Sequence, residues 1–326
     1  MRCLLGFVAT IILVSVLRAQ DQNDPSSSSA PTQPGAEKQA ILLTKLEERI
    51  AEINRGLDGV LGVAILDLTS GHKYLLNGDE VFPQASSIKV PLLLELYRQS
   101  QENSEGQAKL TDLYTVRQED LVPDSDILLG LTPGVTRLTN RDLATMVVAV
   151  SDNSATNVLI DRVGMENVNK LMDRLGLKRT RLRRKMMDLK AAQEGRENVS
   201  TPREMMLLLD AIYHGKVLNK TTTENFLKML STHKDSALLR GLPDGVRAAN
   251  KPGALEAVRN DSGIIFAPNR PFVLCIMATY LRNERAGEKA ISEIAAAAYS
   301  HFDRLGRASP YGRVISPGTS GPETGR

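Results

Sequence analysis

The chain has 326 residues, of which 42% are hydrophobic and 24% are charged, and its formal net charge is +3. This length and composition are typical of a globular protein with a sizeable core, and they exclude a wholly disordered or fibrous chain. The balance of 41 basic and 38 acidic residues argues against a nucleic-acid partner. Two cysteines are too few for a disulfide scaffold.

Residues 1–19 are predicted to be a secretory signal peptide. Arg2 gives a positive start, and the segment 4–17 is almost wholly apolar. An uncleaved N-terminal anchor is the alternative, although the apolar run is short for a membrane span. Cleavage would leave 39 basic and 38 acidic residues, no membrane span, and Cys275 as a lone cysteine without a disulfide. We therefore expect an exported protein, periplasmic or secreted.

Two polar stretches flank the part of the chain that is expected to fold. Residues 20–36 are rich in Ser, Pro, Gln and Asp, which is typical of a disordered linker, and residues 308–326 have the same character. One folded domain is therefore expected over residues 37–307, and it contains no internal repeat.

The first predicted elements are a helix over residues 37–54 and a hairpin of strands over residues 60–68 and 73–76. Helical patterns then dominate the middle of the chain. They cover residues 87–99, 139–150, 153–163 and 166–175, and a further helix starts at Thr201-Pro202.

Strand patterns return near the C-terminus. Residues 262–266 and 271–277 form a second predicted hairpin, and an Ala-rich helix over residues 286–304 follows. Strands at both ends with helices between them predict an α/β protein of the α+β kind. Its antiparallel sheet would be built from the two ends, flanked by helices, with an all-helical subdomain inserted.

Ser86 and Lys89 lie three residues apart at the start of a predicted helix, so both side chains project from one side of its first turn. A lysine can serve as the base for such a serine when burial or nearby cations lower its pKa. The same spacing recurs at residues 70–73 and 231–234, but neither pair is followed by a buried helix. Alone, the Ser86 pair would be no more than a helix start.

Two further motifs follow in the chain. Ser151-Asp152-Asn153 supplies a hydroxyl and a carboxamide between two helices, and Lys251-Pro252-Gly253 supplies an amine and a glycine before the terminal hairpin. With the Ser86 motif they resemble the S-x-x-K, S-D-N and K-T-G set of class A β-lactamases and penicillin-binding proteins. The resemblance covers the whole predicted domain. It implies a β-lactamase/transpeptidase-like fold with a sheet of about five strands.

The resemblance also implies a role for each motif residue. The catalytic residues would be the nucleophile Ser86, its base Lys89, the proton donor Ser151, and Lys251, which would attract a substrate carboxylate and hold Ser151. Backbone N–H groups of Ser86 and Ala254 would form the oxyanion hole. The substrate-binding residues would be Asn153, Gly253 and Ala254.

The sequence departs from the family pattern where a Glu should activate the water that releases the acyl group. Met186 stands at that position, and a thioether cannot take a proton from water. Asp188 lies on the same loop and could substitute only if the backbone followed a different path. Otherwise it is a solvated loop carboxylate.

The motif that supplies Lys251 departs as well. Pro252 replaces the usual Thr or Ser and has neither its hydroxyl nor a backbone N–H. Ser262 occupies the place of an arginine that often supports the substrate carboxylate, and Arg259 is a candidate stand-in. Arg184 is expected either to lie on a solvated basic face or to anchor its loop to Glu197 or Asn198.

The resemblance therefore implies an exported serine hydrolase that opens the β-lactam amide through a Ser86 acyl-enzyme, with slow deacylation. One alternative is a D-Ala-D-Ala carboxypeptidase or penicillin-binding protein acting on peptidoglycan. Another is a non-catalytic domain that binds wall peptide. We expect a monomer whose ligand is a β-lactam or a D-Ala-D-Ala peptide, with no nucleic-acid partner, no cofactor and no metal.

Overall fold

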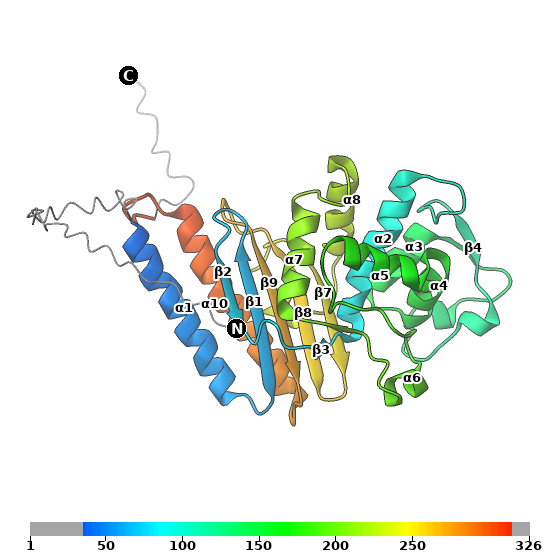
Figure 1. Ribbon diagram of the computed structural model, residues 1–326, viewed down its shortest axis with the longest axis horizontal. Coiled ribbons are helices and arrows are strands. Elements are labelled where there is room, and N and C mark those ends of the chain that lie inside the picture. The colour runs from blue at the N-terminus through cyan, green and yellow to red at the C-terminus, as the bar shows by residue number, and fades with distance from the viewer. Residues whose placement is uncertain (1–34, 315–326) are drawn as a thin grey trace, which may run out of the picture. The chain divides into compact units, whose positions relative to one another are not determined.

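The computed structural model describes residues 35–314. A five-stranded antiparallel sheet is built from strands near both ends of this part of the chain (Figure 1). The strand order is β2-β1-β9-β8-β7, so β7 is an edge strand. The strands are β1 (Val60–Asp67), β2 (Lys73–Leu76), β7 (Ala248–Leu255), β8 (Val258–Ile265) and β9 (Phe272–Thr279).

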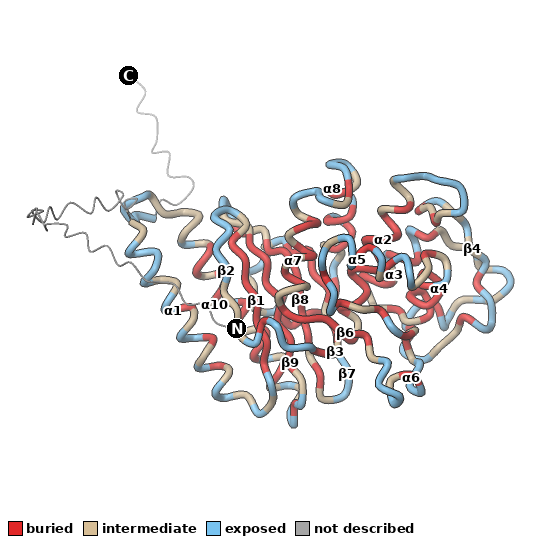
Figure 2. The backbone as a smooth tube through the Cα atoms, viewed as in Figure 1, coloured by how far each residue is buried: buried red, intermediate tan, exposed pale blue. Residues whose placement is uncertain are grey.

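Helices cover both faces of the sheet, because its central strands are apolar on both sides. On one face lie α1 (Ala36–Gly56) and α10 (Glu284–Arg307), whose buried residues form one core cluster with Val63 and Ile65 of β1. On the other face α7 (Pro202–Tyr213) packs on β1 and β9, and a second core cluster begins with Ala64 and Leu66. Figure 2 shows the buried strands between these layers.

A mainly helical region is inserted between β2 and β7 and packs around α2 and α4. Its helices are α2 (Lys89–Glu102), α3 (Asn140–Ala149), α4 (Asn153–Val163), α5 (Met165–Arg174), α6 (Leu189–Gln193), α8 (Lys220–Leu230) and α9 (Ala237–Arg240). Short 3-10 helices are η1 (Ala85–Ile88), η2 (Gln118–Asp120) and η3 (Leu128–Gly130). Two short strand pairs complete it: β3 (Phe82–Pro83) with β6 (Val199–Ser200), and β4 (Leu113–Thr115) with β5 (Arg137–Thr139).

The predicted fold class is confirmed, including the sheet built from both ends and the inserted helical region. Helix starts with side-chain caps were the most readable signals. Thr139 caps α3 in a reciprocal capping box with Asp142, and Thr201 caps α7 just before its N-terminal proline. The sequence prediction missed β7, α6, α8 and α9, and the short strands β4, β5 and β6.

The ends of the described part differ from the expected boundaries. Residues 308–314, predicted to be tail, form a turn in which Ser309 N–H donates to Arg313 O at 2.9 Å. This turn packs on the start of α1, where a Cβ at Gly35 would lie 2.2 Å from Pro310 O. The predicted signal peptide, residues 1–19, lies outside the described residues. Within residues 35–314, no helix is both long and apolar enough to cross a membrane.

Candidate active site

Ser86 lies in η1, at the junction between the sheet and the helical region. Ser87 Oγ donates to Lys251 O at 3.0 Å, which fixes η1 against β7. Gly253 permits this close approach, because a Cβ there would lie 2.9 Å from Ser87 N and 3.0 Å from Ser86 N. The Ser86 amide therefore lies beside β7, the strand that carries the predicted oxyanion partner Ala254.

Lys89 starts α2 and is completely buried. Its Nζ donates to Ser151 O at 2.6 Å, to Ser151 Oγ at 3.0 Å and to Asn153 Oδ1 at 2.9 Å. Ser151 lies in the turn between α3 and α4, and Asn153 is the first residue of α4. This turn requires a positive φ of 60° at Ser151, an uncommon conformation for a residue with a Cβ.

Lys251 approaches the same hydroxyl from β7. Its Nζ donates to Ser151 Oγ at 3.1 Å and to Pro252 O at 3.0 Å. Ser151 Oγ therefore lies between the two amines, and the structure brings together side chains from three separate motifs. Pro252 itself causes no break in the sheet, because an edge strand tolerates a residue without a backbone N–H.

Both lysines are driven toward the neutral form. Burial, followed by the positive charge of Lys251, holds the pKa of Lys89 well below its usual range, and Asp152 opposes the shift only in part. Burial also lowers the pKa of Lys251 to about 7, although Asp261 attracts its proton. An amine of this kind can accept a proton at neutral pH, which a solvated lysine cannot.

A cleft of about 380 Å³ opens over these residues. Its lining includes most of the predicted site residues: Ser86, Ser151, Asn153, Lys251, Gly253 and Ala254. Lys89 does not line it, because Lys89 lies beneath Ser151 and is fully buried. Among residues 35–314, no cluster of His, Cys, Asp or Glu that could hold a metal ion is found.

The loop that should carry the deacylating base is tightly held, with Met186 buried in its middle. Asn157 clamps the backbone of Met186: its Oδ1 accepts from Met186 N at 2.8 Å and its Nδ2 donates to Met186 O at 3.1 Å. Asp188 is exposed, accepts from Ala191 N at 3.0 Å as the cap of α6, and does not line the cleft. The structure therefore does not bring Asp188 together with Ser86.

Arg184 anchors the same loop, as one of the two alternatives predicted. Its guanidinium donates to Glu197 Oε1 at 3.0 Å, and Asn198 Oδ1 accepts from its backbone N–H at 3.1 Å. The loop is joined to the nucleophile segment as well, since Gln84 N–H donates to Asn198 O at 2.8 Å. A rigid loop of this kind fixes where residue 186 lies relative to Ser86.

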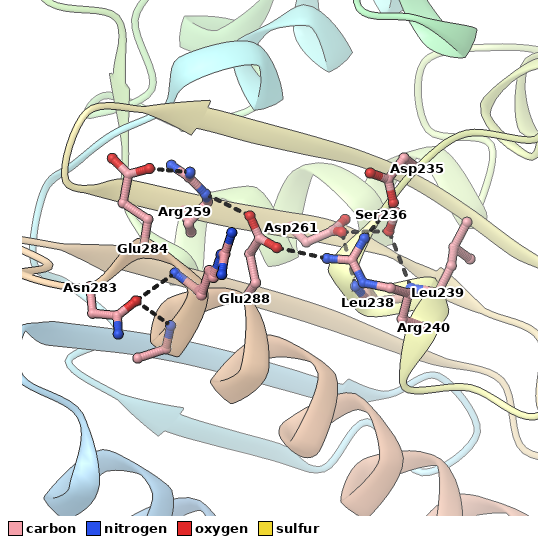
Figure 3. Close-up of polar contacts among 12 residues, drawn as sticks. Asp235, Ser236, Leu238, Leu239, Arg240, Arg259, Asp261, Asn283, Glu284 and Glu288 are labelled. Carbon is pink, nitrogen blue, oxygen red and sulfur yellow. Dashed lines mark hydrogen bonds and ion pairs between the residues drawn. The ribbon is translucent and has the colours of Figure 1, made fainter.

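A row of alternating charges forms one wall of the cleft (Figure 3). Glu288 accepts from Arg240 Nη2 and from Arg259 Nε, at 3.0 Å each, and the outer ends of the two guanidinium groups pair with Asp235 and Glu284. Arg259 also donates to two backbone carbonyls. Its donors are thus engaged within the protein, so Arg259 is not a free cation for a substrate carboxylate.

The sequence analysis missed a buried polar group behind Lys251. Lys234, Asn250 and Asp261 are all buried there, and Asn250 bonds to both of the others. Lys234 was visible only as one of the extra Ser-x-x-Lys matches. Asp261 precedes the predicted start of its strand, so its inward orientation could not be read from the sequence.

Comparison with known proteins decides the family. The profile of the Beta-lactamase enzyme family matches residues 45–302. The chain belongs to this family. Beta-lactamase ROB-1 from Haemophilus influenzae is 29% identical over 294 residues, which cover 87% of this chain and 91% of that protein.

Solved structures of family members resemble the described fold. A beta-lactamase from Sphaerobacter thermophilus is 33% identical with a TM-score of 0.71, covering 78% of this chain and 95% of its own. PBP-A is 27% identical with a TM-score of 0.72, covering 81% of this chain and 97% of its own. A variant of PBP-A was solved as an acyl-enzyme with penicillin G. The chain is thus similar both to β-lactamases and to a protein of which a variant has been captured in the acylated state.

Proposed function

We propose that the protein is an exported serine hydrolase that opens the β-lactam ring through a Ser86 acyl-enzyme and releases the product slowly. The observation that carries the proposal is the buried Lys89, whose amine lies in one hydrogen-bonded group with Ser151 and Asn153 beside the nucleophile segment. Membership of the β-lactamase family supports the reaction class.

In the acylation step, Ser86 Oγ attacks the lactam carbonyl carbon and its proton passes to neutral Lys89. The N–H groups of Ser86 and Ala254 stabilise the oxyanion, a contribution typically worth about 3–4 kcal/mol per donor. When the C–N bond breaks, the ring nitrogen takes a proton through Ser151, which contacts both lysines. Lys251 binds the substrate carboxylate, and Asn153 binds the side-chain amide.

Release of the acyl group needs a base that activates water. Met186 supplies none, and Asp188 points its carboxylate at the N-terminus of α6. The ester on Ser86 is therefore expected to persist. The same catalytic residues, without a glutamate to activate water, also fit a second candidate function, that of a D-Ala-D-Ala carboxypeptidase. The similarity to PBP-A supports this second candidate.

The test is intact mass after exposure to benzylpenicillin. We expect a gain of one whole penicillin, because ring opening loses no atoms, and we expect the adduct to persist after free drug is removed. S86A should remain unlabelled, and S70A, which alters the exposed Ser-x-x-Lys match, should label normally. Rapid turnover of a chromogenic cephalosporin would contradict slow release.

The same preparation distinguishes the alternatives. Release of D-Ala from a muropeptide, abolished by S86A, would assign the carboxypeptidase activity. A protein that neither acquires a penicillin adduct nor releases D-Ala would be a non-catalytic wall-peptide-binding domain, and the proposal of a Ser86 nucleophile would be wrong.

A further inference from the structure

A second buried lysine lies behind Lys251. Lys234 follows α8, is 5% exposed, and donates from Nζ to Leu230 O at 2.7 Å and to Asn250 Oδ1 at 3.4 Å. Asn250 turns its Nδ2 the other way and donates to Asp261 Oδ1 at 2.7 Å. The carboxamide therefore bridges a buried amine on one side and a buried carboxylate on the other.

Asp261 is fixed in this position by further donors. Ser236 Oγ donates to its Oδ2 at 2.6 Å, a contact visible in Figure 3, and Leu238 N–H donates to the same oxygen at 3.2 Å. The charge of this one carboxylate acts on two amines, that of Lys234, which it reaches through Asn250, and that of Lys251, which follows Asn250 in β7; all three charged groups are buried. If both amines held a proton, one positive charge would lack a counter-ion in a site of low dielectric constant.

We propose that Lys234 is a positioning residue for substrate binding: through Asn250 it engages the buried carboxylate of Asp261, so that Lys251 holds its proton firmly only when an anionic substrate is bound. The inference rests on the proposed function, because it assigns the substrate carboxylate to Lys251. It adds to that function a coupling between substrate binding and protonation of Lys251. The substrate carboxylate would be the counter-ion that the protonated lysine otherwise lacks.

The charges around Lys251 agree with this assignment. Burial lowers the pKa of Lys234 to about 8 and that of Lys251 to about 7, and the charge of Lys234 lowers the pKa of Lys251 further. From the helical side, Lys89 and Asp152 face the site.

The other charged groups lie on the cleft wall. Four of them form the row of alternating charges described above and neutralise one another in part. The other two, Asp124 and Asp126, are exposed to water. All six therefore affect the pKa of Lys251 less than buried Lys234 does. They are Asp124, Asp126, Asp235, Arg240, Arg259 and Glu288.

The experiment compares two forms of one penicillin, the free acid and its methyl ester, as acylating agents of the full chain. Rates of adduct formation are measured between pH 5.5 and 9.5. The ratio of acid to ester rates cancels the titration of Lys89, which both reactions share. In the wild type the ratio should fall above about pH 7, as Lys251 loses its proton.

K234M removes the like charge and should move the midpoint of this fall upward by about one pH unit, a tenfold change in proton affinity. D261N removes the attracting charge and should move it downward. K234R keeps the charge and should keep the wild-type midpoint. K228M, at an exposed position of α8, is the matched control and should change nothing.

An unchanged midpoint in folded K234M would overturn the inference. If K234M does not fold, a wild-type ratio that stays flat to pH 9.5 would overturn it instead. If no β-lactam acylates the protein, the proposed function fails. The inference is then tested by NMR titration of the Lys251 side chain. The pKa of Lys251 must be higher in K234M than in the wild type, and an equal pKa would overturn the inference.

Discussion

Ser151 is the residue on which the candidate site converges. Its Oγ accepts from Lys89 at 3.0 Å and from Lys251 at 3.1 Å, so one hydroxyl separates two amines that would otherwise repel each other at short range. The next residue, Asp152, stabilises the turn by two hydrogen bonds: its Oδ1 accepts from Ala155 N and its Oδ2 accepts from Leu128 N. The uncommon positive φ at Ser151 is thus stabilised by contacts on both sides.

The depressed pKa of Lys89 makes a prediction about pH. Neutral Lys89 is the proposed base, so the rate of acylation by an uncharged β-lactam ester should rise with pH through the lowered pKa and level off well below 10.5. K89M should reduce the rate by roughly 10²–10⁴-fold, the usual contribution of general-base catalysis. K73M, in the exposed Ser-x-x-Lys match on β2, is the control and should retain the wild-type rate. A wild-type profile that is flat with pH would remove Lys89 from the role of base.

Met186 gives a second prediction at the residue scale. Its backbone is clamped by Asn157, so M186E should place a carboxylate at this loop position without moving the chain. Burial raises the pKa of such a carboxyl toward neutrality, which suits a base for water.

We expect M186E to shorten the lifetime of the penicilloyl adduct at least about tenfold, at a cost in stability of roughly 1–3 kcal/mol for the buried polar group. M186Q is the matched control, since it has the shape of Glu without its basicity. The measurement is the decay of the adduct by intact mass. Equal lifetimes in both variants would show that residue 186 does not reach the reacting water.

At the scale of elements, the sequence predicts what local chemistry encodes. The two hairpins, the capped starts of α3 and α7, and α4 over residues 153–163 follow from periodicity and capping residues. β7 was missed, because Asn250, Lys251, Pro252 and Gly253 do not form a strand pattern. Pairing with β8 and contact with η1 make this segment a strand, and both are tertiary effects.

The candidate site likewise combines features that the sequence predicts with features that depend on tertiary packing. The order of the motifs predicts that Ser86, Ser151 and Lys251 lie in one site. It could not place Lys234 there, because the distance between Lys234 and Asn250 depends on how α8 packs against β7. A buried charged residue that acts through a second residue has no fixed sequence spacing from the residue that it affects, so no motif reveals it.

The contact between β7 and η1 makes a prediction of its own. A Cβ at residue 253 would lie 2.8 Å from Gln84 O and 3.0 Å from Ser86 N, and both are backbone atoms that cannot rotate away. G253A should therefore push β7 from η1 and displace one proposed oxyanion donor, which would lower the acylation rate by roughly 10²-fold. G56A, where no atom lies within 4 Å of the new Cβ, should acylate normally. Full activity of G253A would mean that the gap between the two segments can widen without consequence.

At the scale of the whole molecule, the sheet joins strands from both ends of the described segment, and the inserted helices bring the buried lysines to its edge. Three lysines are buried among residues 35–314: Lys89, Lys234 and Lys251. In the unfolded chain their amines would be solvated and protonated up to a pKa of about 10.4. Folding therefore has to remove or shield positive charge, and this links stability to pH.

The sign of this linkage follows from the lowered pKa values. Between about pH 7 and 9.5 the unfolded chain binds more protons than the folded one, because Lys251 and Lys234 titrate near 7 and 8 when folded. The free energy of unfolding should therefore rise with pH in this window, by up to about 1.4 kcal/mol per pH unit for each lysine that is neutral only in the fold. Above this window, the raised pKa values of Tyr97 and Tyr114 should reverse the trend.

Chemical denaturation at fixed pH steps measures this directly, with K251M as the informative variant. K251M removes one titrating amine from a position that is 1% exposed, so its stability should exceed that of the wild type most at pH 7 and least at pH 9.5. K228M, which alters an exposed lysine, should follow the wild-type curve throughout. A wild-type stability that falls steadily from pH 7 to 9.5 would mean that the buried amines keep their protons in the folded state. A protonated Lys89 could not accept the proton of Ser86, so this result would also count against the proposed acylation step.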